Sequence, residues 1–227
     1  MSTRFAAPQK RSVQRISAAA CAVLVTTVLL VACVPPVAPG PAVRPQPIGR
    51  GKVADSMVAP VECSKPVIAK IRGFCFGGGL GLAAACDIRI CSEDATFRMP
   101  AARLGLGYGH KGIKRFTDII GLANATDIFV TARRFDAPDA LRMGFVSRVC
   151  AGSEIDAVVD QYTKMIGENA PLTVAASKFN IRQVCAHPEE QDMERAVQMV
   201  KNCFASEDFK EGRTAFMEKR PAQFKGR

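Results

Sequence analysis

Between Lys65 and Asp87, a strand-like segment, a run of three glycines and a helix of small apolar residues follow one another. Residues 65–72 predict a buried strand, and Gly78–Cys86 predict a helix. A helix leaves its first backbone N–H groups without partners, and its dipole favours negative charge there. The turn at Gly77–Gly79 can therefore hold a phosphate or an oxyanion. The glycines equally suit close packing of the helix on the strand, and that structural interpretation stays open.

The glycine run fits neither common nucleotide-binding motif. In a G-x-G-x-x-G frame that begins at Gly77, the last position is Leu82, and no Gly-Lys-Ser/Thr triplet follows. The oxyanion of a thioester or an enolate is then the competing candidate for this turn.

The positive charge of the chain is concentrated at its start. Residues 1–52 contain seven Lys or Arg and no acid, whereas residues 53–227 contain 24 basic and 21 acidic side chains, a net charge of only +3. The body of the chain therefore gives no case for nucleic acid as a partner.

Neither cysteine nor histidine spacing predicts a metal site. The nine cysteines contain no C-x-x-C pair, and several lie in apolar runs, as small buried thiols do. His110 and His187 are the only histidines, so a His-rich metal site is excluded. The sequence therefore predicts no metal and no bound cofactor.

Residues 1–52 form a segment unlike the rest. Arg11 and Arg15 precede an apolar run over residues 16–34, which includes Cys33, and a Pro-rich stretch follows. This pattern is typical of a bacterial lipoprotein signal. If residues 11–33 are a true signal, the protein has a membrane as a partner; otherwise no membrane partner is expected. A misassigned or frameshifted start, or a disordered extension, explains the same composition.

Beyond residue 53 the pattern is that of a globular α/β protein. We expect strands at residues 87–91 and 145–150, a short segment at 96–99, and helices at 136–144 and 153–168. Ser153 and Asp156 resemble a capping box for the last of these helices. A further apolar stripe at helical spacing predicts a core or subunit-contact surface and comprises Met193, Val197, Val200 and Phe204.

Four segments together resemble the crotonase (enoyl-CoA hydratase/isomerase) superfamily in order and spacing: Pro66–Asp87, Phe97–Gly107, Ala137–Val149 and Ser206–Arg220. The resemblance implies an α/β fold, a crotonase-like ββα superhelix that is N-terminally truncated. It implies a core at residues 53–152 and a C-terminal helical trimerisation region at 153–227. It also implies a homo-trimer or hexamer that acts in the cytoplasm on acyl-CoA thioesters.

The resemblance assigns roles to individual residues. The backbone N–H of Gly78, flanked by Gly77 and Gly79, would hold the thioester oxygen as it becomes an enolate-like anion. Gly109, near the start of the next helix, would act from the same side of the pocket. Phe216 and Lys219 match positions that help to bind the CoA adenine, often that of a neighbouring subunit.

Three departures from the family pattern bear on the reaction. The two glutamates that act as general acid and base in the hydratases are Gly81 and Ala101 here. The early strands of the fold, with the loop that supplies the other oxyanion N–H, have no counterpart in residues 1–52. Their loss would leave the strand at Val67–Ile71 without neighbours on one side.

Other polar side chains can replace the missing carboxylates. Arg103, Tyr108 and His110 lie on the loop that faces the acyl group in relatives, and an imidazole is a suitable general base near neutral pH. Tyr108 and His110 can instead cap and pack the following helix. Three hypotheses stay open: an enzyme acting on acyl-CoA, a catalytically inactive truncated member of the family, and an exported lipoprotein anchored through Cys33.

Overall fold

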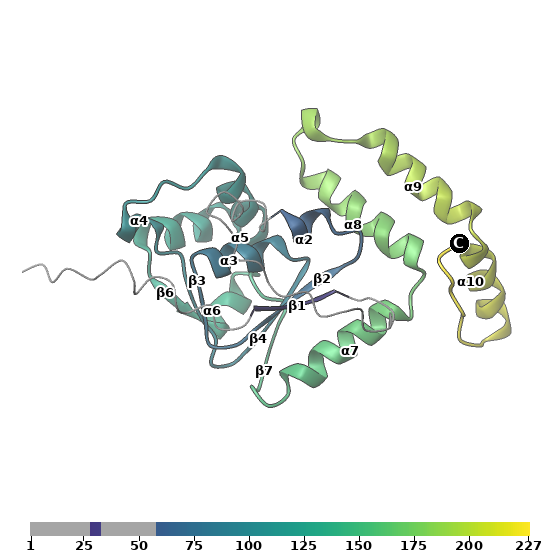
Figure 1. The fold of residues 1–227 in the computed structure, drawn as a ribbon, viewed down its shortest axis with the longest axis horizontal. Helices are drawn as coiled ribbons and strands as arrows, with labels where there is room; N and C mark the ends of the chain where they lie inside the picture. The colour runs from purple at the N-terminus through teal and green to yellow at the C-terminus, as the bar shows by residue number, and fades with distance from the viewer. Residues whose placement is uncertain (1–27, 33–57) are drawn as a thin grey trace, which may run out of the picture.

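The computed structural model describes residues 28–32 and 58–227 (Figure 1). Its strands are β1 (Val28–Ala32), β2 (Val67–Ile71), β3 (Phe74–Phe76), β4 (Ile88–Ser92), β5 (Thr96–Arg98), β6 (Arg134–Asp136) and β7 (Arg148–Cys150). Its helices are α2 (Ala59–Glu62), α3 (Gly78–Ala85), α4 (Ala101–Leu104), α5 (His110–Thr131), α6 (Ala137–Arg142), α7 (Ile155–Gly167), α8 (Pro171–Cys185), η3 (Pro188–Glu190), α9 (Met193–Ala205) and α10 (Glu207–Glu218).

Two consecutive units of two strands and a helix form the centre of the molecule. β2, β3 and α3 make the first unit, and β4, β5 and α4 make the second. The first strand of each unit enters a four-stranded sheet of order β1-β2-β4-β7, and the second enters a three-stranded sheet of order β3-β5-β6. Because β2 pairs in parallel with β4 and β3 pairs in parallel with β5, the units stack as repeats. This is the ββα arrangement that the sequence predicts.

β1 occupies the outer edge of β2. It pairs antiparallel along the whole strand, from Val28 opposite Ile71 to Ala32 opposite Val67. The expectation that β2 lacks a neighbour on this side is therefore wrong. β1 falls within the apolar run at residues 16–34. Arg11, Arg15 and Cys33, on which the signal hypothesis depends, lie outside the described residues.

The larger hydrophobic core of the described residues is rich in aromatic side chains and lies between α3, α5, α6 and the strands. Phe97, Phe116 and Phe145 are almost fully buried, and Phe97 contacts Phe145 edge-to-face with ring centroids 5.7 Å apart. A smaller cluster joins Ile68 and Ile90 of the four-stranded sheet to α7. Burying such side chains contributes roughly 1.5–3 kcal/mol each.

The helix ends show which local signals decide the structure. Asp136 caps α6, because its carboxylate accepts a hydrogen bond from Asp139 N, and Gly144 follows the helix with a φ of +77°.

The capping box expected at Ser153 and Asp156 is wrong, because Glu154 is the N-cap of α7 and makes no side-chain cap bond. Asp156 instead binds Lys70 in β2 (2.5 Å) and Arg72, the residue that follows β2 (2.6 Å). These bonds lower the pKa of Asp156, the contact with Lys70 most of all.

Asp87 joins the C-terminal helices to the sheet. Its carboxylate accepts hydrogen bonds from Val67 N (2.7 Å) and Arg182 (2.6 Å), and it pairs with the Lys178 ammonium at 2.8 Å. Lys178 is buried and also donates to the carbonyls of Pro60 (3.0 Å) and Lys65 (2.8 Å). A buried charge is tolerated only when its partners are complete, and these three acceptors satisfy the ammonium.

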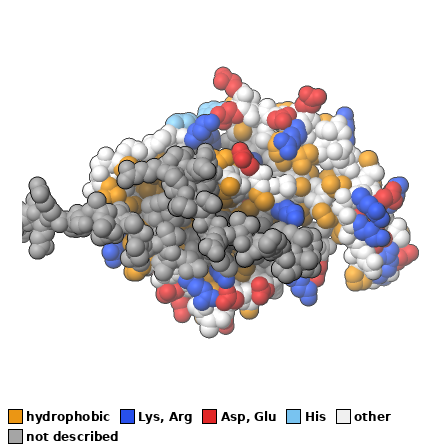
Figure 2. Space-filling view, in the orientation of Figure 1, with side chains coloured by type: hydrophobic (Ala, Val, Ile, Leu, Met, Phe, Trp, Pro, Cys, Tyr) orange, Lys and Arg blue, Asp and Glu red, His pale blue; other side chains and the backbone are white. Residues whose placement is uncertain are grey.

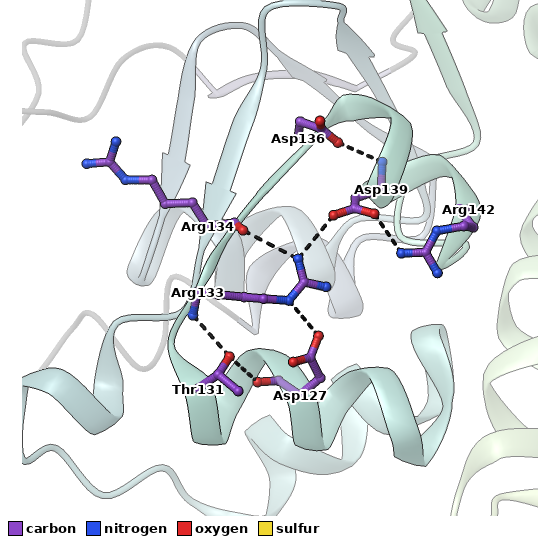
Figure 3. Close-up of polar contacts among 7 residues, drawn as sticks. All are labelled: Asp127, Thr131, Arg133, Arg134, Asp136, Asp139 and Arg142. Carbon is purple, nitrogen blue, oxygen red and sulfur yellow. Dashed lines mark hydrogen bonds and ion pairs between the residues drawn. The ribbon is translucent and has the colours of Figure 1, made fainter.

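A second polar network fixes the turn from α5 into β6 and α6 (Figure 3). Arg133 lies between Asp127 on α5, at 2.6 Å, and Asp139 on α6, at 3.1 Å, and Arg142 binds the other oxygen of Asp139. Arg142 and Arg133 hold the pKa of Asp139 below its ordinary value. The network keeps Ala132, a buried residue with a φ of +48°, at the end of α5.

Replacing Asp87 with Asn removes the negative charge that Lys178 and Arg182 share, and keeps the shape of the side chain. We expect the free energy of unfolding to fall by about 2–3 kcal/mol, because a buried ammonium is left without its counter-charge. Urea denaturation measures the change. Glu168→Gln is the matched control, because Glu168 pairs with Lys164 at 3.9 Å in an exposed position; it should cost below about 0.5 kcal/mol. Equal losses in the two variants would contradict the role of Asp87.

Candidate active site

The start of α3 presents unpaired backbone donors. The first hydrogen bond of the helix runs from Gly81 N to Gly77 O at 2.9 Å, so the N–H groups of Gly78, Gly79 and Leu80 precede the helical ladder. Gly77 is the N-cap and provides no side-chain cap, and Gly78 is exposed. Three donors at the positive end of a helix dipole favour an oxygen that carries negative charge.

The strands place a second helix start beside these donors. β3 and β5 are parallel neighbours, with Phe76 opposite Arg98, so α3 and α4 begin at the same edge of the three-stranded sheet. Gly77 N donates to Arg98 O at 2.9 Å. Gly77 has a φ of +54°, and a Cβ there would lie 3.7 Å from the Pro100 ring. A glycine is required because this backbone conformation strains any other residue.

The two positions that hold glutamates in the hydratases are apolar and buried here. Gly81 lies inside α3, and Ala101 is the first residue of α4 with 5% of its surface exposed. Gly81 and Ala101 are both buried. Neither can transfer a proton.

The segment that follows α4 carries exposed residues that the sequence assigns to the site. Arg103 is exposed in the last turn of α4, and Gly105, in the left-handed conformation at φ +66°, ends this helix. Gly109 is the N-cap of α5, as the sequence predicts, and His110 is its first residue, with an exposed side chain.

Tyr108 packs on α5. Its ring contacts Phe129 edge-to-face, with centroids 5.1 Å apart, and burial raises the pKa of its phenol. The phenol therefore keeps its proton at neutral pH. The packing role that the sequence left open for Tyr108 is present in the structure.

Several cysteines lie near the site and none is suited to act as a nucleophile. Cys75, Cys86 and Cys91 are buried. Burial raises the pKa of Cys75 to about 12, of Cys86 to about 11 and of Cys91 to about 12. These thiols stay protonated at neutral pH and serve as small apolar side chains, as the sequence predicts.

The two residues matched to CoA adenine binding lie away from the start of α3. Phe216 and Lys219 belong to α10 and its end, on the opposite side of the molecule from α3 and α4 (Figure 1). Phe216 is 82% exposed, and Lys219 has a φ of +54°. Phe216 borders an apolar groove of about 690 Å³ between α8, α9 and α10. Within one chain, the structure does not bring these residues to the glycine run.

The sequence does not predict that His187, which precedes η3, lies near His110. Its ring centroid lies 6.2 Å from that of His110. No local pattern could have indicated this, because the contact depends on how α8 returns over α5.

A model of the enoyl-CoA hydratase/isomerase family matches residues 41–227. The chain belongs to this family. It is 37% identical over 164 residues to a short-chain-enoyl-CoA hydratase of Clostridium acetobutylicum, which covers 72% of this chain and 63% of that protein. It is 35% identical over 170 residues to a carnitinyl-CoA dehydratase of Salmonella typhi, with 73% and 65% covered.

Solved structures of the family share the fold. An enoyl-CoA hydratase/isomerase family protein from Hyphomonas neptunium superimposes with a TM-score of 0.72 at 34% identity, covering 78% of this chain and 67% of that one. An enoyl-CoA hydratase from Bacillus anthracis gives a TM-score of 0.69 at 28% identity, with 78% and 69% covered. The chain thus spans slightly less than two thirds of the length of the first curated relatives, 63% and 65%.

The described part of the chain contains neither a membrane-spanning helix nor a metal-binding cluster. Among its residues, no helix combines the length and apolar character needed to cross a membrane. They also hold no cluster of three or more His, Cys, Asp or Glu side chains arranged to bind a metal.

Acidification should release the turn that follows α10. Arg220 binds both oxygens of Glu211, at 2.6 and 3.0 Å, and Gln223 N donates to the same carboxylate at 2.9 Å. Chiefly because of Arg220, the pKa of Glu211 falls from the ordinary 4.5 to about 2. The stabilisation is thus complete above the ordinary carboxyl pKa and is lost as the pH falls through about 2.

The backbone amide resonance of Gln223 in an NMR titration measures this release. We expect its midpoint to lie near 2, and we expect Glu211→Gln to abolish the titration. A midpoint at the ordinary 4.5 would contradict the bonded geometry.

Proposed function

We propose that the chain binds acyl-CoA thioesters and stabilises the enolate-like anion formed from them. The observation that supports this most directly is the group of N–H donors at Gly78, Gly79 and Leu80, which precede the hydrogen-bond ladder of α3. Donors of this kind, held in place before the reaction, stabilise developing negative charge by about 3–4 kcal/mol each. Family membership supplies the substrate class, because the curated relatives are named for reactions of CoA thioesters.

In this proposal Gly78 donates to the thioester oxygen, and Gly77 and Gly79 allow the substrate to approach the backbone. Gly109 is the N-cap of α5, and we propose that the dipole of this second helix acts on the same oxygen. The loop that gives the other oxyanion donor in relatives has no counterpart among the described residues. No metal or cofactor takes part, and the CoA thioester is the substrate.

Water addition in the hydratases uses two glutamate side chains. In this chain Gly81 and Ala101 stand at those two positions, so the carboxylates for water addition are missing. We propose instead a proton transfer at the carbon next to the thioester, with His110 as the base. His110 is exposed at the start of α5, where an imidazole can reach a substrate, and Arg103 is exposed on the preceding helix. The same substitutions favour a second candidate, a family member that binds acyl-CoA without turning it over.

Assembly would complete the substrate site. Phe216 and Lys219 lie away from Gly78 within one chain, so a neighbouring subunit would supply them. The stripe on α9 supports a homo-trimer or hexamer, because Met193, Val197 and Phe204 are at least half exposed, at 54%, 50% and 64%. A CoA substrate further supports a cytoplasmic location.

Replacing Gly78 with Pro tests the donor directly. Proline lacks an N–H but is well suited to the first position of a helix, whereas Gly78→Ala adds a Cβ and keeps the donor. We expect Gly78→Pro to slow deuterium exchange at the α-carbon of an acyl-CoA in D₂O by about 100-fold or more. NMR follows the exchange, and calorimetry should show acyl-CoA binding retained. Equal exchange rates in the two variants would rule out the Gly78 N–H as the oxyanion donor.

His110→Asn tests the base. We expect acyl-CoA affinity to be kept and exchange to slow by about 100-fold, the scale of general-base catalysis. Arg103→Gln changes a candidate substrate-binding residue on the same segment, so it should weaken acyl-CoA binding and leave most of the exchange rate at saturating substrate. An unchanged rate in His110→Asn would leave this residue as part of the helix start. Binding without exchange in the native protein would favour the non-catalytic candidate.

A further inference from the structure

The two histidines of this chain lie against one another on the surface. His110 opens α5, and His187 follows α8. Their ring centroids are 6.2 Å apart with an angle of 32° between the ring planes. Both side chains are exposed, and the histidine surface lies at the upper edge of the view in Figure 2.

Two contacts fix the backbone segments that present this pair. Lys114, in the second turn of α5, donates to the carbonyl of Cys185 at 2.6 Å and so binds the end of α8. Lys111 pairs with Glu190 of η3 at 3.7 Å. These contacts flank the histidines on both segments. The two backbone segments that carry the imidazoles are therefore held near each other before any ligand binds.

The surrounding charges do not oppose a cation. Lys111 has Glu190 as its counter-charge, and Lys114 has Asp118 at 2.7 Å. Glu189 adds a further carboxylate beside His187 in the sequence. The positive end of the α5 dipole and the ammonium of Lys111 are unfavourable for a cation, and solvent screens both at an exposed site.

The spacing of the rings suits one shared metal ion. A transition metal lies about 2.0–2.1 Å from a ligating imidazole nitrogen, which places it about 3.2 Å from the ring centroid. Two imidazoles at a tetrahedral angle then have centroids about 5.2 Å apart, and a linear arrangement separates them by about 6.4 Å. The observed 6.2 Å lies between these limits, and exposed side chains can rotate to close the difference.

We propose that His110 and His187 together bind one divalent transition-metal ion of the kind that prefers imidazole ligands, such as Ni²⁺, Cu²⁺ or Zn²⁺. Water completes the coordination, because the described residues offer no cluster of three or more ligating side chains. Counting histidines in the sequence excluded a His-rich site, but two imidazoles from distant segments suffice for a site of modest affinity. Binding connects the start of α5 to the segment after α8. It does not require the proposed function, but a bound ion would compete for the His110 imidazole that the proposed proton transfer uses as a base.

Isothermal titration of the full chain, without an affinity tag, with NiCl₂ tests the site. We expect one Ni²⁺ per chain, and we expect His110→Asn and His187→Asn each to weaken the affinity by at least about tenfold, because each removes one of two ligands. Thermal unfolding gives an independent measure, since bound Ni²⁺ should raise Tm in the native protein and not in either variant. Mg²⁺, which prefers oxygen ligands, should leave Tm unchanged.

Cys185→Ser is the matched control, because Cys185 is exposed and lies close to the pair in the sequence. It should bind Ni²⁺ within about twofold of the native affinity, since a thiol is not part of the site. The proposal is overturned if the native chain does not bind Ni²⁺, if either histidine variant retains native affinity, or if Cys185→Ser abolishes binding.

Discussion

The hydrogen bond from Gly77 N to Arg98 O determines where the candidate active site can exist. It continues the pairing of β3 with β5 into the turn, so α3 must begin directly above the neighbouring strand. The positive φ of Gly77 then turns the chain directly after β3. The N–H groups of the next three residues therefore take no part in the pairing of β3 with β5. Because β5 leads into α4 at the same edge, the first residue of α4 also lies here. Strand pairing thus brings the glycine run at Gly77–Gly79 close to Pro100, the N-cap of α4.

Local chemistry made much of the fold predictable. The Asp136 cap, the glycine that follows α6 and the buried pattern of β2 depend on neighbouring residues alone, and the structure confirms each of them. The start of α7 was mispredicted for the converse reason. Asp156 has the spacing of a capping residue, but two cations on another element compete for its carboxylate. Charge-assisted bonds of this kind are stronger than a bond to a backbone N–H of a helix end.

The candidate site was predictable only in part. The positions of Gly78, Gly81, Ala101 and Gly109 follow from motifs, because each motif coincides with the start or the interior of a helix. The side chains around them do not follow from any motif. The ring of Tyr108 packs on Phe129, which lies beyond the non-helical break in α5 at Gly121, and His187 arrives from a segment beyond α8. Such contacts depend on how helices cross, and a single sequence does not encode helix crossing in its local spacing.

The buried ammonium of Lys178 has a consequence for how the molecule opens. Two of its acceptors, the carbonyls of Pro60 and Lys65, belong to the chain that enters the first repeat, and the third is at the start of β4. Separating α8 from the sheet would break all three contacts at once, together with the bond from Arg182 of α8 to Asp87. The long C-terminal helices therefore cannot unfold independently of the strand entry, and the two parts of the chain should exchange their amide hydrogens as one cooperative unit.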